Sequence, residues 1–526
     1  MTTASEWTPG EAAAKDPHDR PERPWWQGAV FYQIYPRSFL DTDGDGVGDL
    51  EGIRRRLPYL ARLGVEALWI SPFYRSPMAD YGYDVADHCD VDPLFGVLDD
   101  ARELVRDAHE HGLRVVVDYV PNHTSDQHEW FIDARSSRTS AHRDWYVWAG
   151  DDPAAPPNGW MSFFSGGPAW TWDAATGQWY LHLFLPEQPD LDWRNRDVVD
   201  AMHDVLRFWL DMGVDGFRID VAFLVGKDVP LRADAPRPAP SPYTHEVLRG
   251  VRRLLDDYPR DRVSIGEIYI MSTRAVAEFY GRNDELHLNF NFPPLYAAFE
   301  EPAWRACIDN VVDALDPIGA WPTWVLSNHD NPRHRTRYGS ADKARAAALL
   351  LLGLRGTPFL YAGEELGLSD AVVPPERRAD PVGRDGCRAP IPWEAGPGHG
   401  WPVDDPWLPW PPEAPAAHAA AQEADPASSL HLYRAALAAR RRSPALRHGD
   451  FRWLEAPPGV LAFARGSGAD QVDVVVNMTG GEVRFPGAYE LLVASAPGQA
   501  EWRGVLGAWS AAWLAPRPAR GRRRRP

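Results

Sequence analysis

Short apolar segments rich in β-branched and aromatic residues alternate along the chain with segments of helical spacing. In one of the latter, Leu98, Ala101, Leu104, Val105 and Ala108 repeat at the intervals of a single helix face. Strands that alternate with helices predict a parallel sheet with right-handed crossovers, and eight such units fit a (β/α)8 TIM barrel better than an open sheet. The eight candidate strands begin at or near Ala29, Val65, Leu113, Val214, Arg262, Leu286 (the weakest of them), Pro322 and Thr357.

The spacing of these strands indicates an insertion into the barrel. One strand–helix unit takes roughly 30 residues, whereas the ends of the third and fourth strands, at Asp118 and Asp220, lie much farther apart. The segment between them is rich in tryptophan. A second insertion, residues 362–428, follows the eighth strand, and its Ala/Pro-rich part favours a flexible loop. From about His448 onward, short alternating segments predict a small antiparallel β domain.

The predicted organisation is therefore a barrel with one inserted subdomain after strand three and a C-terminal domain. The barrel takes residues 25–121 and 190–447, the Trp-rich subdomain takes residues 122–189, and the β domain takes residues 448–515. Residues 1–24 are polar and rich in proline, which predicts a flexible N-terminal arm. Residues 516–526 form a short basic tail, which we expect to be a solvated end.

Composition disfavours several classes of function. The chain of 526 residues has a formal net charge of −19, so we expect no binding to nucleic acid or to anionic membranes, whereas a neutral substrate meets no such penalty. Three scattered cysteines provide neither a disulfide framework nor the spacing of zinc ligands. We find neither a signal peptide nor an apolar run long enough to span a membrane, which favours a cytoplasmic enzyme.

Four candidate strands end on or next to acidic residues. In a barrel the carboxyl ends of the strands converge on one mouth, where active sites are built. One or two such acids could be helix caps, but four of them, flanked by histidine, asparagine and arginine, favour a catalytic site. Paired carboxylates without a redox cofactor point to glycoside chemistry, in which one carboxylate attacks the anomeric carbon and the other protonates the leaving oxygen. The four acids are Asp118, Asp220, Glu267 and Asp330.

The motifs around these acids resemble those of glycoside hydrolase family 13, the α-amylase family, and within it the branch of α-glucosidases and oligo-1,6-glucosidases. The resemblance extends from about Trp25 to Ala515 and implies a barrel enzyme that removes terminal α-glucose from short oligosaccharides with retention of configuration. The segments that carry it are YQIYPRSF (32–39), MADYGYDV (78–85), DYVPNH (118–123), QPDLDW (188–193), GFRID (216–220), GEIY (266–269) and SNHD (327–330).

Position by position, the resemblance implies a role for each acid of the site. Asp220 would be the nucleophile, Glu267 the general acid and base, and Asp330 the stabiliser of the transition state. Arg218 lies two residues before Asp220 on the same strand face, so we expect it to lower the pKa of Asp220. The pKa of Glu267 is expected to be raised, and the carboxyls of Asp220 and Glu267 should lie about 5–5.5 Å apart.

Further residues of these motifs are expected to surround the glucose at the non-reducing end. A pocket closed at that end implies that glucose is removed one unit at a time. The arginine expected to pair with Asp80 is Arg384, with Arg388 of the same segment as the alternative, and two histidines are expected to donate hydrogen bonds to glucose hydroxyls. The substrate-binding residues implied in this way are Asp80, Tyr83, His123, Arg218, His329 and Arg384.

Acidic residues alternate with other residues in the segment DTDGDGVGD, residues 41–49. Alternating oxygen ligands suit a hard cation, but this is not an EF-hand, because the twelfth position is Gly52. A solvated acidic turn is the alternative. The segment resembles the calcium loop of the branch, which implies a structural Ca²⁺, with Mg²⁺ left open and no organic cofactor. The implied ligands are Asp41, Asp43, Asp45, the Val47 carbonyl and Asp49.

The sequence leaves the cleaved linkage open. In this branch a valine after the nucleophile, here Val221, tends to accompany α-1,6 action, and alanine or threonine α-1,4 action, but one methyl-scale contact changes specificity by only about 1–3 kcal/mol. A transglucosylase or isomerase, such as a sucrose isomerase or trehalose synthase, is the alternative function. A non-catalytic relative is disfavoured because all three acids are present. Nothing in the sequence predicts the oligomeric state.

Overall fold

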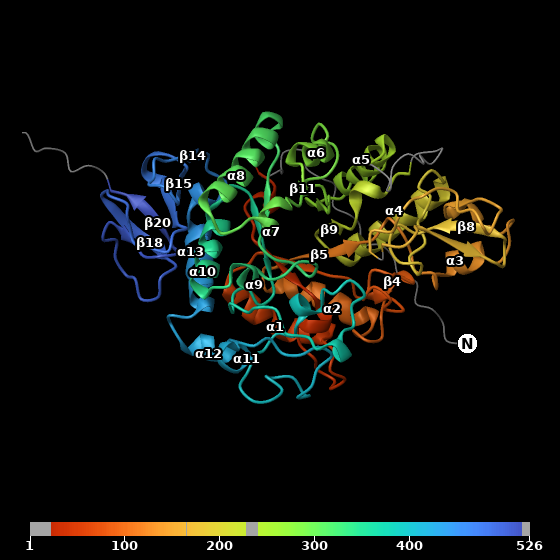
Figure 1. Cartoon of the computed structure of the whole chain (residues 1–526), viewed down its shortest axis with the longest axis horizontal. Helices are drawn as coiled ribbons and strands as arrows, with labels where there is room; N and C mark the ends of the chain where they lie inside the picture. The colour runs from red at the N-terminus through yellow and green to blue at the C-terminus, as the bar shows by residue number, and fades with distance from the viewer. Residues whose placement is uncertain (1–22, 165, 228–239, 518–526) are drawn as a thin grey trace, which may run out of the picture.

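The computed structural model describes residues 23–164, 166–227 and 240–517, and its centre is a sheet of eight parallel strands (Figure 1). All eight candidate strands form, and the weakest candidate, near Leu286, is a strand of only two residues. The strands are β1 (Phe31–Ile34), β2 (Ala67–Ile70), β5 (Arg114–Tyr119), β9 (Gly216–Ile219), β10 (Val263–Gly266), β11 (Leu288–Asn289), β12 (Thr323–Val325) and β13 (Thr357–Tyr361).

The strand order confirms the (β/α)8 barrel. Neighbouring strands pair in the order β11–β10–β9–β5–β2–β1–β13–β12, the order of consecutive units around a barrel. The two ends of this series are linked through Thr323 of β12, whose Oγ1 donates a hydrogen bond of 2.6 Å to the carbonyl oxygen of Asn289 in β11. Buried side chains such as Phe31, Trp69 and Phe359 pack together inside, so the barrel is a filled core and not a pore.

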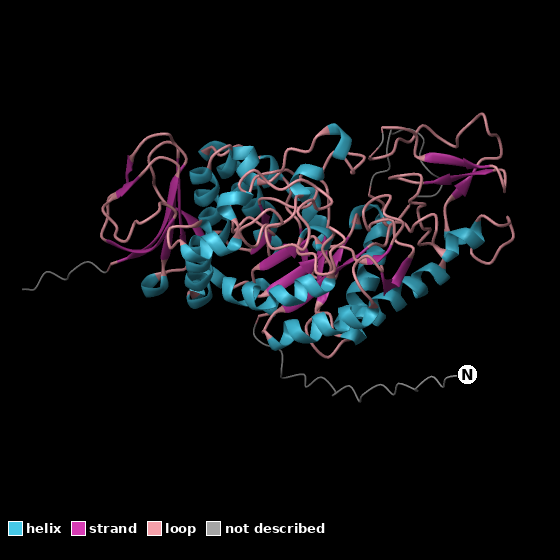
Figure 2. Ribbon diagram, turned by 90° about the horizontal axis from the view of Figure 1, so that it is seen from below, coloured by secondary structure: helices cyan, strands magenta, loops and turns pink. Residues whose placement is uncertain are grey.

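Helices cover the outside of the sheet (Figure 2). In α2 (Leu98–Glu110) the residues Ala101, Leu104, Val105 and Ala108 are buried, as the helical spacing predicts. The helix α10 (Ala341–Gly353) is buried on almost every side because it lies between the barrel and the C-terminal sheet. The other long helices are α1 (Leu50–Leu63), α4 (Arg196–Met212), α5 (Pro242–Asp256), α8 (Glu301–Leu315) and α13 (Ser429–Arg442).

The Trp-rich segment 122–189 projects from one end of the molecule (Figure 1). It contains α3 (Glu129–Ala134) and an antiparallel sheet of β6 (Trp148–Ala149), β8 (Gln178–Leu181) and β7 (Trp170–Asp173). Trp160 and Trp170 are buried within it, and the ring of Trp148 stacks on Phe131. Tryptophans here therefore build the core of the insertion. A further two-stranded sheet, β3 (Tyr74–Arg75) with β4 (Asp87–Val91), follows β2.

At the opposite end of the molecule the chain forms the predicted C-terminal antiparallel β domain (Figure 1). A buried arginine connects it to the barrel: Arg465 donates a hydrogen bond of 2.7 Å to the carbonyl oxygen of Gly353 at the end of α10. The sheet strands are, in spatial order, β14 (Phe451–Trp453), β15 (Val460–Arg465), β16 (Val472–Asn477), β20 (Ser510–Pro516) and β18 (Tyr489–Ala494), and β17 (Val483–Arg484) pairs with β19 (Val505–Leu506).

The Ala/Pro-rich segment after β13 differs from its prediction as a flexible loop. It forms two short helices, α11 (Ala414–Ala417) and α12 (Ala419–Ala424), in which Ala414 and Gln422 are buried. Alanine has the highest helix propensity, and Gln422 Nε2 donates a hydrogen bond of 2.6 Å to the carbonyl oxygen of Leu366 near the barrel. The flexible-loop prediction is therefore wrong, because it rested on composition alone.

Some predictions concern residues that the structure does not describe. Residues 1–22 of the N-terminal arm and residues 518–526 of the basic tail lie outside the described residues, as do residues 228–239 between β9 and α5. Among the helices that are described, none is long and apolar enough to cross a membrane. The cytoplasmic location stays a prediction.

Candidate active site

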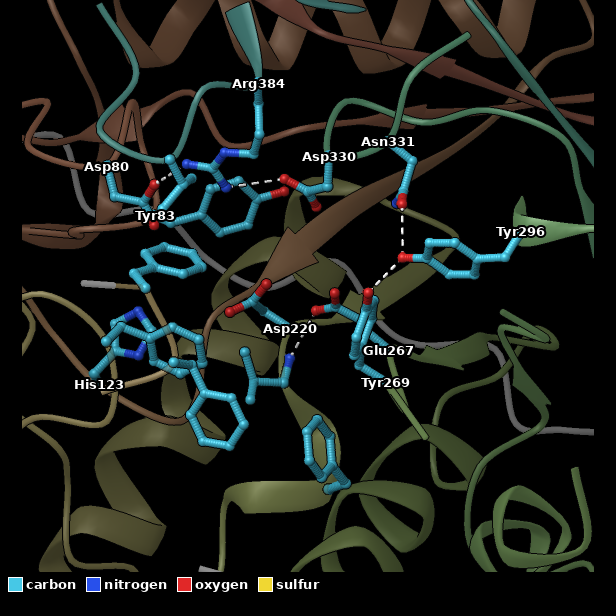
Figure 3. Close-up of a pocket in the computed structure, with 16 residues that line it drawn as sticks. Asp80, Tyr83, His123, Asp220, Glu267, Tyr269, Tyr296, Asp330, Asn331 and Arg384 are labelled. Atoms are coloured by element: carbon cyan, nitrogen blue, oxygen red, sulfur yellow. Dashed lines mark hydrogen bonds and ion pairs between the residues drawn. The ribbon is translucent and has the colours of Figure 1, made fainter. Parts of the chain in front are cut away.

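Acids from several strands meet at the carboxyl end of the barrel. Asp118 lies in β5, Asp220 follows β9 directly, Glu267 follows β10 directly, and Asp330 lies in the loop after β12. The last three line one pocket of about 360 Å³ (Figure 3), a volume typical of small-molecule sites. Parallel strands place their carboxyl ends on one rim, and residues far apart in the sequence thereby become neighbours.

One buried guanidinium holds three of these carboxylates together. Nη1 of Arg218 lies 2.7 Å from Asp118 Oδ1 and 2.6 Å from Asp220 Oδ1, and Nη2 lies 2.7 Å from Glu267 Oε2. Arg218 and Asp220 come from the same end of β9, and Glu267 comes from the neighbouring β10. Asp220 and Glu267 therefore contact the same guanidinium and line the same pocket, whereas their separation of about 5–5.5 Å stays a prediction.

The electrostatics of Asp220 differ from the expectation. Burial raises the pKa of Asp220 well above its ordinary value, and although Arg218 lowers it, Glu267 and Asp118 raise it further. Burial likewise raises the pKa of Asp118 to about 6. Arg218 thus lowers the pKa of Asp220 as predicted, but burial and the two neighbouring carboxylates outweigh it, because one cation is shared among three carboxylates.

Val221 links the two catalytic candidates through an unusual backbone conformation. Its φ of 44° lies in the left-handed region, which β-branched residues rarely adopt. In this conformation its backbone N–H donates a hydrogen bond of 3.1 Å to Glu267 Oε2. The strained residue thus fixes the Glu267 carboxyl relative to Asp220, and strain of this kind is concentrated at functional sites.

Arg384 and the two acids with which it forms ion pairs make up one side of the pocket (Figure 3). Its Nη2 lies 2.7 Å from Asp80 Oδ1, and its Nη1 lies 2.9 Å from Asp330 Oδ1. Arg388 is buried, and its Nη2 lies 3.2 Å from Asp330 Oδ1. Of the two arginines considered as the partner of Asp80, Arg384 is therefore the one that pairs with it.

The two arginines also decide the charge of Asp330. Burial acts to raise the pKa of Asp330, but His329, Arg384 and Arg388 together hold it well below its ordinary range. Burial lowers the pKa of His329 itself to about 3, so this ring is neutral at pH 7. The ionised state of Asp330 therefore depends on the arginines.

The two candidate histidines occupy different places. His123 lines the pocket, and burial lowers its pKa to about 3, so it is neutral at pH 7. His329 is buried behind Tyr83: its Nε2 lies 2.7 Å from the Tyr83 hydroxyl, and its Nδ1 lies 2.7 Å from Gln33 Nε2. Tyr83 itself lines the pocket. The hydrogen bonds from both histidines to glucose hydroxyls stay a prediction.

Much of the pocket wall consists of residues that the sequence did not single out. Tyr269, Tyr296 and Asn331 form a hydrogen-bonded bridge: the two tyrosine hydroxyls are bonded to each other, and that of Tyr296 donates to Asn331 Oδ1 at 2.9 Å (Figure 3). Tyr269 belongs to the GEIY motif and Asn331 follows SNHD directly, but no sequence signal marks Tyr296. The aromatic residues that the inserted segment contributes to the wall are Phe163, Phe164 and Phe184.

Three acids of the segment 41–49 form a separate cluster. Asp41, Asp43 and Asp49 each place a carboxylate oxygen within 4.8 Å of the other two, and the first and last of them are buried. Asp45 is exposed, and its Oδ1 accepts a hydrogen bond of 2.7 Å from the backbone N–H of Val47. A donor set of oxygens, two of them buried, fits a hard cation. Three of the five ligands implied for the cation therefore have their carboxylate oxygens close together.

Comparisons with known proteins identify the family. The family model described as the α-amylase catalytic domain matches residues 33–449. A probable α-glucosidase of Rhizobium meliloti is 43% identical over 499 residues, which cover 87% of this chain and 90% of that protein. A probable oligo-1,6-glucosidase of Bacillus subtilis is 33% identical over 515 residues, covering 88% and 92%.

Similarity to a solved structure supports the same family. The crystal structure of an α-glucosyl transfer enzyme, XgtA, matches with a TM-score of 0.86 and 40% identity, and the match covers 94% of this chain and all of that one. This similarity, together with the family match over most of the chain, places the barrel and its acids in one known family. The chain therefore belongs to the α-amylase family, glycoside hydrolase family 13, and within it to the branch of α-glucosidases and oligo-1,6-glucosidases.

Proposed function

We propose that this protein is a glycoside hydrolase, an exo-acting and retaining α-glucosidase that removes terminal glucose from the non-reducing end of short α-glucosides. The observation that carries the proposal is the pair of carboxyls of Asp220 and Glu267, joined by Arg218 in one pocket. Membership of the α-amylase family supports it, as do the relatives named α-glucosidase and oligo-1,6-glucosidase.

The proposed reaction has two displacements at the anomeric carbon C1 of the terminal glucose. First, the Asp220 carboxylate attacks C1 while Glu267 gives a proton to the departing glycosidic oxygen, leaving a glucosyl ester on Asp220. Glu267 then takes a proton from a water molecule, whose oxygen attacks C1 and breaks the ester. Two displacements return C1 to its original configuration. The ionised Asp330 would stabilise the positive charge that develops on the sugar ring between these states.

The boundary formed by Asp80 and Arg384 supports exo-action. The two side chains are joined by an ion pair of 2.7 Å and both line the pocket, so a sugar chain that continued beyond the bound glucose would have to break this pair. Phe163 and Phe164, from the inserted segment, narrow the same pocket with apolar side chains. A site of this shape suits one terminal glucose unit.

A substrate panel tests the proposed activity. Maltose, isomaltose, sucrose, trehalose and a nitrophenyl α-glucoside would each be incubated with the enzyme, and the products would be identified. Release of glucose from short α-glucosides supports the proposal, whereas background rates with every substrate would contradict it. The panel also decides between α-1,4 and α-1,6 preference. Val221 lines the pocket, but its presence there does not determine which linkage is cleaved.

The alternative function is glucosyl transfer or sugar isomerisation. The similarity to XgtA, which is described as an α-glucosyl transfer enzyme, supports glucosyl transfer as the alternative. Hydrolase and transferase share the glucosyl ester on Asp220 and differ in whether water or a sugar hydroxyl attacks it. Disaccharide products that outweigh free glucose, from maltose or sucrose in dilute solution, would favour the alternative.

The raised pKa of Asp220 predicts the acid side of the pH profile. Attack on C1 requires ionised Asp220, and burial raises its pKa, so kcat/KM is expected to fall with decreasing pH at a midpoint above the ordinary Asp value of about 3.9. Replacing Asp118 with asparagine removes one of the like charges and should move that midpoint to lower pH. Steady-state kinetics at controlled pH measure both. A midpoint at or below the ordinary value would contradict the prediction.

We also infer that the segment 41–49 binds a structural divalent cation, with Asp41, Asp43 and Asp49 as its carboxylate ligands. The grouping of their oxygens within 4.8 Å supports this inference. Burial raises the pKa of Asp49, and a bound cation would offset the cost of holding such carboxylates ionised close together. Asp45 and the Val47 carbonyl would complete the expected set, with Ca²⁺ or Mg²⁺ as the ion.

Chelation is expected to destabilise the fold. A cation present at about 100 times its Kd adds about 2.7 kcal/mol to the free energy of unfolding, so EDTA should lower the Tm measured by differential scanning fluorimetry, and added Ca²⁺ should restore it. Asp41→Asn should lower the Tm and abolish the response to EDTA. Asp99→Asn, at an exposed acid on α2, should leave the response unchanged. A wild-type Tm insensitive to EDTA would contradict the site.

A further inference from the structure

Two buried aspartates hold the loop that carries Arg384: Asp385 accepts hydrogen bonds of 3.0 Å from the backbone of Ala379 and Asp380, and Asp380 contacts Arg384 itself. The Asp380 side chain is fully buried. Its Oδ2 accepts hydrogen bonds from the backbone N–H of Arg384 at 2.7 Å and from that of Val382 at 3.2 Å. A single carboxylate therefore closes the turn of residues 380–384, in which both Val382 and Arg384 line the pocket.

The same carboxylate holds the guanidinium of Arg384 along one edge. Its Oδ1 accepts from Nε at 3.0 Å and from Nη2 at 2.5 Å. It also lies 3.5 Å from Nη1 of Arg388. A guanidinium is planar and rigid, so fixing one edge sets the direction of the whole group. With that edge held by Asp380, Nη1 points to Asp330 and Nη2 is shared with Asp80.

Asp380 also contributes a negative charge to the ion-paired cluster that it forms with Arg384, Arg388, Asp80 and Asp330. Burial alone would raise its pKa, but Arg384 and Arg388 lower it below the ordinary range, so the carboxylate is ionised at neutral pH. This cluster contains three acids, Asp80, Asp330 and Asp380, and the guanidinium groups of two arginines, so it has one more acid than guanidinium. Asp380 is therefore an ionised partner of Arg384, and the charge strengthens the hydrogen bonds that hold the Arg384 guanidinium.

We propose that Asp380 is a positioning residue, which holds Arg384 in the orientation that bridges Asp80 and Asp330. The inference rests on the proposed function. Asp380 is not among the residues that line the pocket, so it acts through Arg384 and not on the substrate. Displacement of a positioned group by about 1 Å can cost about 10²-fold in rate. Loss of Asp380 should therefore impair the reaction although Asp220 and Glu267 are intact.

The test uses Asp380→Asn in the full-length enzyme, with a nitrophenyl α-glucoside and the best disaccharide as substrates. We expect kcat/KM to fall about 10²-fold, and Asp380→Glu, which keeps the charge, to recover about tenfold of that loss. The matched control is Asp173→Asn. Asp173 is also buried, pairs with Arg135 at 2.9 Å and accepts from the backbone of Thr176 in its own turn, but lies in β7 of the inserted segment.

The control separates positioning from general loss of stability. Asp173→Asn should keep kcat/KM within about threefold of the wild type, with both variants assayed well below their measured Tm. An equal loss in the control would overturn the proposal, as would a wild-type value of kcat/KM in Asp380→Asn. If the wild type itself hydrolyses none of the panel substrates, the proposed function fails; if only Asp380→Asn is unaffected, this inference alone fails.

A double-mutant cycle asks whether Asp380 acts through Arg384. In an Arg384→Met background, adding Asp380→Asn should change kcat/KM by less than about threefold, because the group that it orients is already absent. Two losses that multiply would show an independent role and overturn the proposal. Should Asp380→Asn not fold, Asp380→Glu replaces it in the same cycle, with the same expected non-additivity.

Discussion

Replacing Asp220 with alanine is expected to lower kcat about 10⁴-fold or more, because the glucosyl ester can no longer form. The side chain lies in the pocket, where Arg218 contacts it at 2.6 Å, so its removal leaves space beside C1. A small anion such as azide is expected to enter this space and attack C1 of an activated glucoside directly. The product would be β-glucosyl azide, since a single displacement inverts the configuration.

The anomer of the azide product makes this experiment decisive. In Glu267→Ala the ester on Asp220 still forms, and azide is expected to displace it, which gives α-glucosyl azide by two inversions. The two variants should therefore give opposite anomers, which NMR distinguishes. If Asp220→Ala hydrolysed the glucoside at the wild-type rate, or if both variants gave the same anomer of the azide, the assignment of the nucleophile would be contradicted.

Replacing Glu267 with glutamine is expected to nearly abolish hydrolysis of maltose or isomaltose, with a loss of about 10²–10⁴-fold. The amide keeps the size of the side chain and can still accept a hydrogen bond from the Val221 N–H, which lies 3.1 Å from the carboxyl oxygen. It cannot give a proton to a poor leaving group. With a dinitrophenyl α-glucoside, whose leaving group needs no proton, the formation of the ester should be much less affected.

The comparison of leaving groups separates this role from others. Rates of ester formation would be measured as a burst of phenol release, and the Tm would show that the fold is kept. An equal loss with all leaving groups would point to a role in binding or in charge stabilisation. Substantial activity of Glu267→Gln on maltose would mean that another group supplies the proton.

The barrel could be predicted because its strands carry a strong local signal. Buried parallel strands appear as short continuous apolar segments, and those at Val65 and Leu113 became β2 and β5. The candidate at Leu286 is weak for a physical reason, since β11 has only two residues. The segment around Ala414 was misjudged because composition describes a single segment, whereas its burial depends on the barrel beneath it.

The site was predictable only in part. The motifs identified Asp220, Glu267 and Asp330, and the structure brings all three to one pocket. The sign of the Asp220 pKa shift could not be predicted, because it depends on burial and on how many carboxylates share Arg218. Asp380 escaped notice because it lies in an irregular segment, where no periodicity indicates which side chains are buried.

The configuration of the first glucose released tests the double displacement at Asp220 and Glu267 most directly. The enzyme would be mixed at high concentration with a nitrophenyl α-glucoside in D₂O, and the anomeric protons followed by NMR before mutarotation equilibrates them. Two displacements predict that α-glucose appears first and converts slowly to β-glucose. Initial release of β-glucose would show a single displacement by water and contradict a covalent ester on Asp220.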